Sequence, residues 1–408
     1  MNRRHFLTAS IASTLASLPA ADRPRRIVLR SSWQTVNIGD IAHTPGVLAL
    51  LEKYLPDVEV WLWPSSVDNG VEEMLMKRFP KLKILKSAGE IRQSWEECDF
   101  LLHGSGPGFV AQKDVAKWQK TGKPYGVYCI TFASKDPEAR ELLSGAKFVY
   151  FRDSVSLQFA KDHGITSPIM EFCPEGSFAV DLRNDAAAEA FLKAHELEKG
   201  KFLCCIPRYR WTPGWLVYKN RPVDEAKLAR DNEMKEHDHA QLRAAIIAVT
   251  RETDMKVLVT CEDQTQITLG KEMLVDPLPE DVKKKVVWRD RYWLTDEALS
   301  TYVRSAGLFG NEMHSPIMCI SSGIPAVVCR FDEQTNKGFM WRDIGLNDWL
   351  FNLDNAEEVA RIAPTVLAIA KDPAAAKAKA AKAREIVQQR QREEMAALTG
   401  SLKKAARA

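Results

Sequence analysis

The stretch DFLLHGSGPG (residues 99–108) contains an unbroken run of bulky apolar residues that leads directly into a loop with three glycines. Continuous apolar runs of this length are typical of strands buried on both faces, as in parallel sheets covered by helices. The loop at Gly104, Ser105 and Gly106 lacks the GxGxxG spacing and the P-loop lysine, so it identifies no particular nucleotide. The stretch therefore predicts a buried parallel strand with a glycine loop at its carboxyl end.

Similar apolar runs lie on both sides of this stretch and alternate with segments of helical periodicity. Because parallel strands need right-handed crossovers, the simplest arrangement is a doubly wound sheet. An alanine-rich, charged segment at residues 184–200 interrupts the rhythm, which then starts again. Strands are expected at residues 26–30, 58–63, 81–85, 99–103, 125–131 and 148–152, with helices at 44–55, 71–79 and 154–163, and further strands at residues 202–206, 256–261, 286–289, 307–310, 325–331 and 349–353.

The chain of 408 residues also exceeds what one hydrophobic core usually serves. We therefore predict an α/β protein with two Rossmann-like domains, each built on a doubly wound parallel sheet. The domains are expected at residues 24–183 and 201–354, with a linking helix at 184–200 and C-terminal helices at 355–408. The part from Pro373 onward is rich in alanine and charge with little apolar stripe, which predicts a solvated helix that frays into a disordered end.

The first residues have a composition of their own. Arg3-Arg4 precede Phe6-Leu7, a mildly apolar run follows, and small residues stand at Ala20-Ala21. This order is typical of a removable signal peptide, and twin arginines resemble a Tat signal. Residues 1–21 are therefore expected to be a Tat-like signal peptide, with the mature chain exported to the periplasm or beyond. The alternative is an amphipathic tail that stays attached.

Composition and charge exclude several classes of function. The formal net charge of +3 gives no nucleic-acid footprint, and no internal run offers the roughly 20 apolar residues of a membrane helix. The eight cysteines show no CxxC and no zinc-ligand spacing. The histidines within residues 236–239 lie two apart, where helical side chains do not face one another. We therefore expect no metal site, no cofactor, no nucleic-acid partner and no transmembrane segment after signal removal.

Four loops at the carboxyl ends of predicted strands hold the residues that could carry chemistry, because ligands of open α/β sheets bind there. The first contains Asn37, Gly39 and Asp40. Its glycine lets backbone approach a ligand, and Asp40 could hold a sugar hydroxyl or accept its proton. Asn37 and Asp40 could equally cap the backbone groups of a turn. The second is the glycine loop at residues 104–106.

The other two loops lie in the second half of the chain. Arg208 and Arg210 follow its first strand, where guanidinium groups suit a carboxylate or phosphate, although both could simply pack on Tyr209 and Trp211 at the surface. His314 stands at a strand-to-helix junction, where an imidazole can give or take a proton at neutral pH. A lone histidine is more often structural, so this residue needs further support.

These loops resemble motifs of the polysaccharide pyruvyl transferase family. The similarity covers roughly residues 26–353 and rests on the order and spacing of several short motifs. They are Asn37-x-Gly39-Asp40, Cys98-Asp99-Phe100 with the glycine loop, Phe151-Arg152-Asp153-Ser154, and Met313-His314-Ser315 through Gly323-Ile324-Pro325 to Phe331-Asp332 and Lys337-Gly338.

The resemblance implies a fold like that of the GT-B glycosyltransferases. It implies transfer of the enolpyruvyl unit of phosphoenolpyruvate onto two hydroxyls of a polysaccharide or oligosaccharide, which makes a pyruvate ketal. His314 would protonate the methylene carbon, Arg208 would grip the anionic groups of the donor, and Lys337 would lie nearby as a further cation. The remaining expected residues are Arg210, Glu312 and Ser315 in the donor site, Asp40 as a second catalytic group, and Asn37, Gly39, Gly104, Ser105 and Gly106 on the acceptor side.

One position departs from the family pattern. The arginine two residues before the histidine is Glu312 here. A carboxylate at this point is expected to repel phosphoenolpyruvate, unless Arg210 or Arg330 compensates its charge. Phosphoenolpyruvate is also a cytoplasmic metabolite, which conflicts with export. The predicted donor is therefore phosphoenolpyruvate or another anionic compound.

Two other functions remain open. A GT-B-type glycosyltransferase with a nucleotide-sugar donor would use the same glycine loops and helix N-termini for its diphosphate. A non-catalytic exported polysaccharide-binding protein would present Trp211, Trp215 and Trp341 as sugar platforms, although core packing explains tryptophans equally well. A ketal product, release of a nucleotide, or glycan binding without turnover distinguishes the three.

Overall fold

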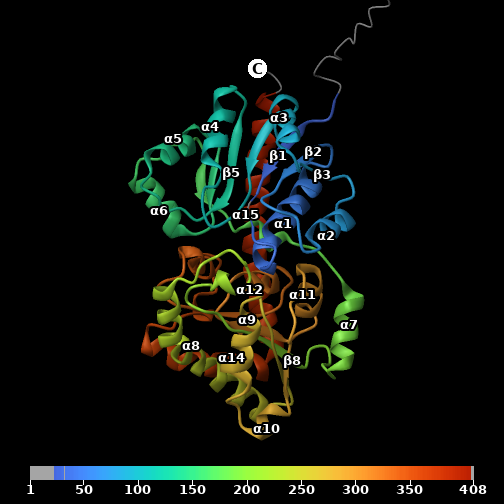
Figure 1. The fold of residues 1–408 in the computed structure, drawn as a ribbon, viewed down its shortest axis with the longest axis vertical. Helices are drawn as coiled ribbons and strands as arrows, with labels where there is room; N and C mark the ends of the chain where they lie inside the picture. The colour runs from blue at the N-terminus through green and yellow to red at the C-terminus, as the bar shows by residue number, and fades with distance from the viewer. Residues whose placement is uncertain (1–22, 32, 406–408) are drawn as a thin grey trace, which may run out of the picture.

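Two parallel sheets, one above the other, form the framework of the computed structural model (Figure 1). The structure describes residues 23–31 and 33–405, so the predicted signal peptide lies outside the described part of the chain. The seven-stranded first sheet has the order β3-β2-β1-β4-β5-β6-β7, and the six-stranded second sheet has the order β10-β9-β8-β11-β12-β13. Neighbouring strands in both orders run parallel. The predicted α/β class with two doubly wound sheets is confirmed.

The first half of the chain supplies the first sheet and the helices on its two faces. Its strands are β1 (Arg26–Arg30), β2 (Glu59–Trp63), β3 (Lys83–Ile84), β4 (Phe100–His103), β5 (Tyr125–Ile130), β6 (Val149–Phe151) and β7 (Met170–Phe172). Its helices are α1 (Ile38–Tyr54), α2 (Val71–Arg78), α3 (Ala88–Glu97), α4 (Gln112–Lys120), α5 (Pro137–Gly145), α6 (Ser154–Asp162) and the 3-10 helix η1 (Gly176–Ala179). Helix α7 (Asp185–Ala194) follows and packs on the helix Thr295–Tyr302 of the second half (Figure 1).

The second half repeats the plan. Its strands are β8 (Phe202–Ile206), β9 (Lys256–Val259), β10 (Val286–Trp288), β11 (Gly307–Gly310), β12 (Ala326–Arg330) and β13 (Leu350–Asn352). Its helices are η2 (Gly214–Leu216), α8 (Glu225–Glu252), α9 (Gln266–Gly270), the π-helix η3 (Lys271–Val275), α10 (Glu280–Lys283), α11 (Thr295–Tyr302), α12 (His314–Ser321), η4 (Asn336–Phe339), α13 (Met340–Asp343), η5 (Asn347–Trp349), α14 (Ala356–Lys371) and α15 (Pro373–Ala405). None of the described helices combines the length and the hydropathy that a membrane crossing requires.

The central strands explain why the sequence pattern predicted the two sheets. Strands β4, β5, β8 and β12 are buried along their whole length. Helices cover both faces of each sheet, so apolar side chains follow one another without alternation. The edge strand β7 was not predicted, because its Met-Glu-Phe sequence is only partly buried and gives no apolar run.

Helix α1 begins earlier than predicted, at Ile38 rather than at residue 44. Asn37 caps it: the side-chain oxygen accepts hydrogen bonds from the backbone N–H groups of Gly39 (2.9 Å) and Asp40 (3.0 Å). Such a cap satisfies backbone donors that lack a partner inside the helix. Pro45 lies within the helix, where the sequence pattern favours a helix start instead.

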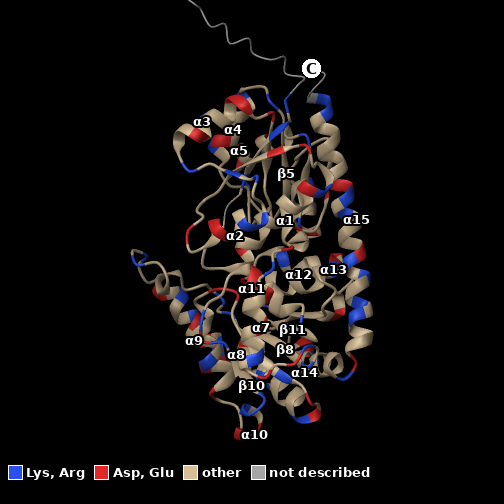
Figure 2. Ribbon diagram, turned by 90° about the vertical axis from the view of Figure 1, so that its right-hand side faces the viewer, with Lys and Arg blue, Asp and Glu red and all other residues tan. Residues whose placement is uncertain are grey.

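The C-terminal segment corrects another prediction. Helix α15 is continuous and runs along both sheets (Figure 2), where it packs on α12 and α1. One face of the helix is buried, so the predicted solvated and fraying helix was wrong up to Ala405. Small alanines make up much of that face and give a weak apolar pattern. The buried residues are Ala376, Ala380, Ala383, Val387, Gln391, Glu394, Met395, Leu398 and Leu402.

Candidate functional site

A cavity of about 350 Å³ lies between the two sheets, where strands of both end and helices begin. From the first half of the chain it is lined by Asp40 and His43 on α1 and by Arg152 after β6. From the second half it is lined, among others, by Glu262 after β9 and by His314 at the start of α12. The cavity therefore lies where open α/β sheets bind their ligands.

The loop before α1 is bonded directly to the second half of the chain. The Ile38 N–H donates to the Glu262 carbonyl (2.9 Å), and Asn37 forms an isolated antiparallel bridge with Asp263. The Asn37 amide also donates to the Asp263 carboxylate (3.3 Å). Because its oxygen caps α1 and its nitrogen holds Asp263, the Asn37 side chain is a structural link in this state.

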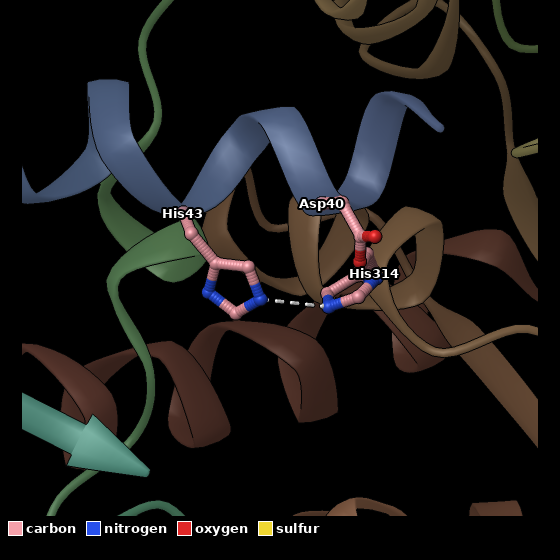
Figure 3. A group of neighbouring side chains, drawn as sticks. All are labelled: Asp40, His43 and His314. Carbon is pink, nitrogen blue, oxygen red and sulfur yellow. Dashed lines mark hydrogen bonds between the residues drawn. The ribbon is translucent and has the colours of Figure 1, made fainter. Parts of the chain in front are cut away.

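Two histidines from different halves face each other across this junction (Figure 3). His43 on α1 and His314 on α12 place their Nε2 atoms 3.0 Å apart, and both side chains are buried. The close approach depends on Gly39, because a Cβ atom there would lie 2.3 Å from the Cβ atom of His314. Thus His314 is not a lone histidine but half of a pair that joins the two halves.

A chain of hydrogen bonds assigns the tautomers of both imidazoles. The Glu262 carboxylate can only accept, so the proton of His314 is on Nδ1 (2.9 Å). In the neutral ring the Nε2 atom of His314 is then an acceptor for the Nε2–H group of His43. The Nδ1 atom of His43 in turn accepts from the Ser105 hydroxyl (2.6 Å), which itself accepts from the Gly176 N–H (3.3 Å). The chain leads from the glycine loop to Glu262.

Cations and carboxylates surround this pair. The Lys337 ammonium on η4 lies 3.1 Å from the Nε2 atom of His314. Glu175 lies 3.5 Å from the same nitrogen and accepts a hydrogen bond from Arg152 (2.7 Å). Asp40, His43 and His314 offer ligand atoms within 4.8 Å of one another. However, the positive charge of Lys337 beside His314 opposes a metal ion at this point.

Burial governs the protonation of these groups. It lowers the pKa of His43 to about 4, and together with the charge of Lys337 it lowers the pKa of His314 well below its usual value. Both imidazoles are therefore neutral near pH 7. Burial raises the pKa of Asp40 to about 7. It would also raise the pKa of Glu175, but the facing histidines and Arg152 bring that pKa below its usual range.

Glu312 is paired with the predicted anion anchor. Its carboxylate accepts from the Arg208 guanidinium (2.7 Å) and from the Gln266 amide (2.6 Å). The compensating cation is therefore Arg208, not Arg210 or Arg330 as predicted. Burial raises the pKa of Glu312 to about 7, against the opposing effect of Arg208. While Glu312 is ionised, its charge masks Arg208.

Arg210 and Ser315 are committed to protein neighbours. The Arg210 guanidinium contacts the carboxylates of Asp238 (2.8 Å), Glu333 (2.7 Å) and Asp354 (2.6 Å). Ser315 is fully buried and donates to Glu262 (2.8 Å). Although Arg210 borders the cavity, protein neighbours already engage both side chains. Their role in the present structure is therefore structural support.

The glycine loop reaches the site through one residue. Gly104 N–H donates to the Arg30 carbonyl (2.8 Å) and Gly106 N–H donates to the Cys129 carbonyl (3.4 Å), so both glycines are fixed to the first sheet. Ser105 between them reaches His43. The loop thus supports the histidine pair.

Sequence reasoning missed four of the residues at this junction. His43 lies within a helical pattern, away from any loop that suggested chemistry. Glu175 follows the unpredicted strand β7. Glu262 and Asp263 directly follow the strand predicted at residues 256–261, and two acids at a strand end were a signal that could have identified them.

Comparison with known proteins places the chain in a family. A family model described as polysaccharide pyruvyl transferase matches residues 37–333. A search of curated proteins finds no match.

Solved structures of similar fold include three from bacteria. The Staphylococcus aureus MnaA–UDP structure has 12% identity and a TM-score of 0.52, and the match covers 88% of this chain and 91% of that one. Anabaena HepE with UDP and glucose has 10% identity, a TM-score of 0.56 and coverage of 92% and 100%. A putative UDP-N-acetylglucosamine 2-epimerase from Listeria monocytogenes has 10% identity, a TM-score of 0.57 and coverage of 93% and 97%. At these identities the likeness confirms the GT-B-like fold alone.

Proposed function

The chain belongs to the polysaccharide pyruvyl transferase family and is a transferase, and we propose that it moves the pyruvyl unit of phosphoenolpyruvate onto two hydroxyls of a polysaccharide sugar. The position of His314 carries this proposal. Its imidazole lines the cavity between the sheets, with the Lys337 ammonium 3.1 Å from its Nε2 atom. A proton-transfer group beside a cation suits a donor whose reactive carbon stands next to a carboxylate and a phosphate.

The proposed reaction joins two hydroxyl oxygens of one sugar to the same carbon of the donor. His314 protonates the methylene carbon of the donor, and a sugar hydroxyl captures the positive charge that develops at the neighbouring carbon. Phosphate leaves, and a second hydroxyl of the same sugar attacks the same carbon. One hydroxyl proton restores the acid and the other leaves with phosphate. The products are a pyruvate ketal and inorganic phosphate.

His314 must first gain a proton, because its imidazole is neutral in the ligand-free protein. After burial, the charge of Lys337 is the main cause of its lowered pKa. A donor that carries a carboxylate and a phosphate counters this charge and so raises the pKa of His314. Donor binding and protonation of the acid are therefore coupled in this proposal.

Arg208 becomes available to the donor when Glu312 takes up a proton. Glu312 has a pKa of about 7, and its protonation weakens the contact with Arg208. The guanidinium can then form charge-assisted hydrogen bonds with the donor. On this proposal Glu312 does not exclude phosphoenolpyruvate but makes its binding depend on pH.

Asp40 is proposed to act on the acceptor. Its pKa of about 7 lies near the operating pH, which suits a general base. It lines the same cavity as His314 but stands at the start of α1, so the two groups approach a bound ligand from different halves of the chain. We propose that Asp40 takes the proton of the first attacking hydroxyl and releases it to solvent, from which His314 regains its proton.

A nucleotide-sugar donor is the second candidate. Structures of similar fold were solved with UDP, although the identity of 10–12% carries no more than the fold. The carboxylates of Asp40, Glu262, Asp263, Glu312 and Glu333 line the cavity, and a nucleotide sugar, which carries less negative charge than phosphoenolpyruvate, would meet less repulsion from them. The two candidate donors can be distinguished by which compound stabilises the folded protein.

Thermal unfolding distinguishes these donors. Phosphoenolpyruvate should raise the Tm of the unmodified protein, and UDP-glucose should not. Lys337→Met should lose the shift because it removes the cation beside His314. Lys117→Met is the control, since this exposed lysine on α4 pairs only locally with Asp114. A Tm shift with UDP-glucose and none with phosphoenolpyruvate would exclude the proposed donor.

A further inference from the structure

A second group of reactive side chains lies buried under α15, outside the cavity. Cys129 in β5, Cys173 directly after β7 and Glu394 on α15 are all fully buried. The thiol of Cys173 lies 2.8 Å from the Glu394 carboxylate, and the thiol of Cys129 lies 3.5 Å from both of its oxygens. One ligand atom from each residue lies within 4.8 Å of the others.

The environment of Glu394 is unusual for a buried carboxylate. In the described part of the chain it takes part in no ion pair, and its polar neighbours are the two thiols and the Tyr128 hydroxyl. Burial raises its pKa well above the usual value, and burial likewise raises the pKa of both thiols. Two thiols and a carboxyl group, each able to ligate a cation once it loses its proton, thus lie together in one buried group.

The backbone at Cys129 adds a second observation. Its φ is +48°, in the left-handed region that favours glycine, and the pairing of β5 with β6 shifts register between Val127 and Ile130. A non-glycine residue seldom adopts this conformation unless the surrounding structure holds it there. The conformation accompanies the approach of the Cys129 side chain to Cys173 and Glu394.

We propose that Cys129, Cys173 and Glu394 bind a zinc ion, which fastens α15 to the first sheet. Thiolate and carboxylate are ligands that zinc accepts, and these three side chains would fill three of the four positions of a tetrahedral zinc ion, whose ligand atoms lie about 3.3–3.8 Å apart. The present separations need only small side-chain adjustments to reach that spacing. Binding releases the two thiol protons and the carboxyl proton to solvent, so the affinity falls at low pH.

The zinc site would stand directly behind the candidate active site. Both thiols lie near the Pro174 carbonyl, at 3.5 Å for Cys129 and 3.6 Å for Cys173. The next residue is Glu175, which lies 3.5 Å from His314. The spacing along the sequence could not suggest this site, because its three ligands come from distant segments that only the fold brings together.

The test is zinc binding by the full chain, measured by metal analysis and by unfolding temperature. Chelator-treated protein supplied with zinc should retain about one ion per chain and show a raised Tm. Cys173→Ser and Glu394→Gln should each weaken zinc binding by at least about tenfold, within the range reported for lost ligand support. Cys319→Ser is the matched control, since this buried cysteine on α12 lies outside the cluster and should retain the ion.

Cobalt binding and a histidine variant test the same site if a cysteine variant fails to fold. Cobalt bound to the unmodified protein should show thiolate-to-metal charge-transfer absorption. His43→Gln should leave zinc binding unchanged, because His43 belongs to the cavity. Loss of the ion in His43→Gln with retention in Cys173→Ser would overturn the proposal, as would a Cys129–Cys173 disulfide in the purified protein or failure to bind either metal.

Discussion

Among single residues, Glu312 is the one whose charge we expect to control binding at the proposed donor site. It pairs with Arg208 at 2.7 Å, and its pKa of about 7 makes that pair sensitive to pH near neutrality. Below pH 7 the carboxyl is increasingly neutral, so both the repulsion of an anion and the masking of Arg208 decline. Above pH 7 both grow. Affinity for an anionic donor should therefore rise as the pH falls through about 7.

The variant Glu312→Gln should remove this dependence. Calorimetric titration with phosphoenolpyruvate at pH 8 should show affinity at least about tenfold tighter than that of the unmodified protein, which corresponds to 1.4 kcal/mol. The difference should narrow towards pH 6. Glu272→Gln is the control, because this carboxylate on η3 pairs with Lys235 and is not among the residues that line the cavity. Equal affinities for Glu312→Gln and the unmodified protein at pH 8 would refute this role.

His314 and Arg208 should have separable kinetic effects. Replacement of the proposed acid in His314→Ala should lower kcat by about a hundredfold or more, as expected for loss of general acid catalysis. Arg208→Lys should mainly raise KM for the donor, because a lysine cannot reproduce the two-pronged contact of a guanidinium. Steady-state phosphate release measures both. Unchanged kinetics in folded variants would remove these roles.

Among the helices, α15 connects the two halves through a buried face that combines alanines with larger apolar side chains such as Val387 and Leu398. Ala380 is fully buried on that face, whereas its neighbour Ala381 is exposed. Ala380→Glu should lower the free energy of unfolding by about 2–4 kcal/mol, because it buries a charge in a packed interface. Ala381→Glu should change it by less than about 0.5 kcal/mol. Urea denaturation followed by circular dichroism compares them, and equal stabilities would show that this face is not a packed contact.

The same elements show what the sequence can reveal. Central strands such as β4 and β8 were predictable because burial on both faces leaves an unbroken apolar run. Helix α15 was not predictable, because alanines, Gln391 and Glu394 interrupt the apolar pattern of its buried face. In the site, Asp40 and His314 were found from their loops, but His43 was not, because its role depends on how α1 meets α12.

At the scale of the whole molecule, the expected export remains a prediction. The twin arginines before Phe6-Leu7 predict Tat-dependent export and a mature N-terminus near Ala21 or Asp22. N-terminal sequencing of protein isolated from its natural source should therefore begin near Asp22, with the material outside the cytoplasm. An intact Met1 on cytoplasmic protein would contradict export and would remove the conflict with a cytoplasmic donor.

We propose that His314, which His43 and Glu262 hold between the two sheets, protonates the methylene carbon of phosphoenolpyruvate. The most direct measurement is turnover in D₂O with an acceptor polysaccharide, followed by mass spectrometry and NMR of the product. We expect a pyruvate ketal whose methyl group carries one deuterium from solvent, together with released phosphate. The variant His314→Ala should form none of this product. Consumption of a nucleotide sugar, with phosphoenolpyruvate left intact and no ketal formed, would contradict it.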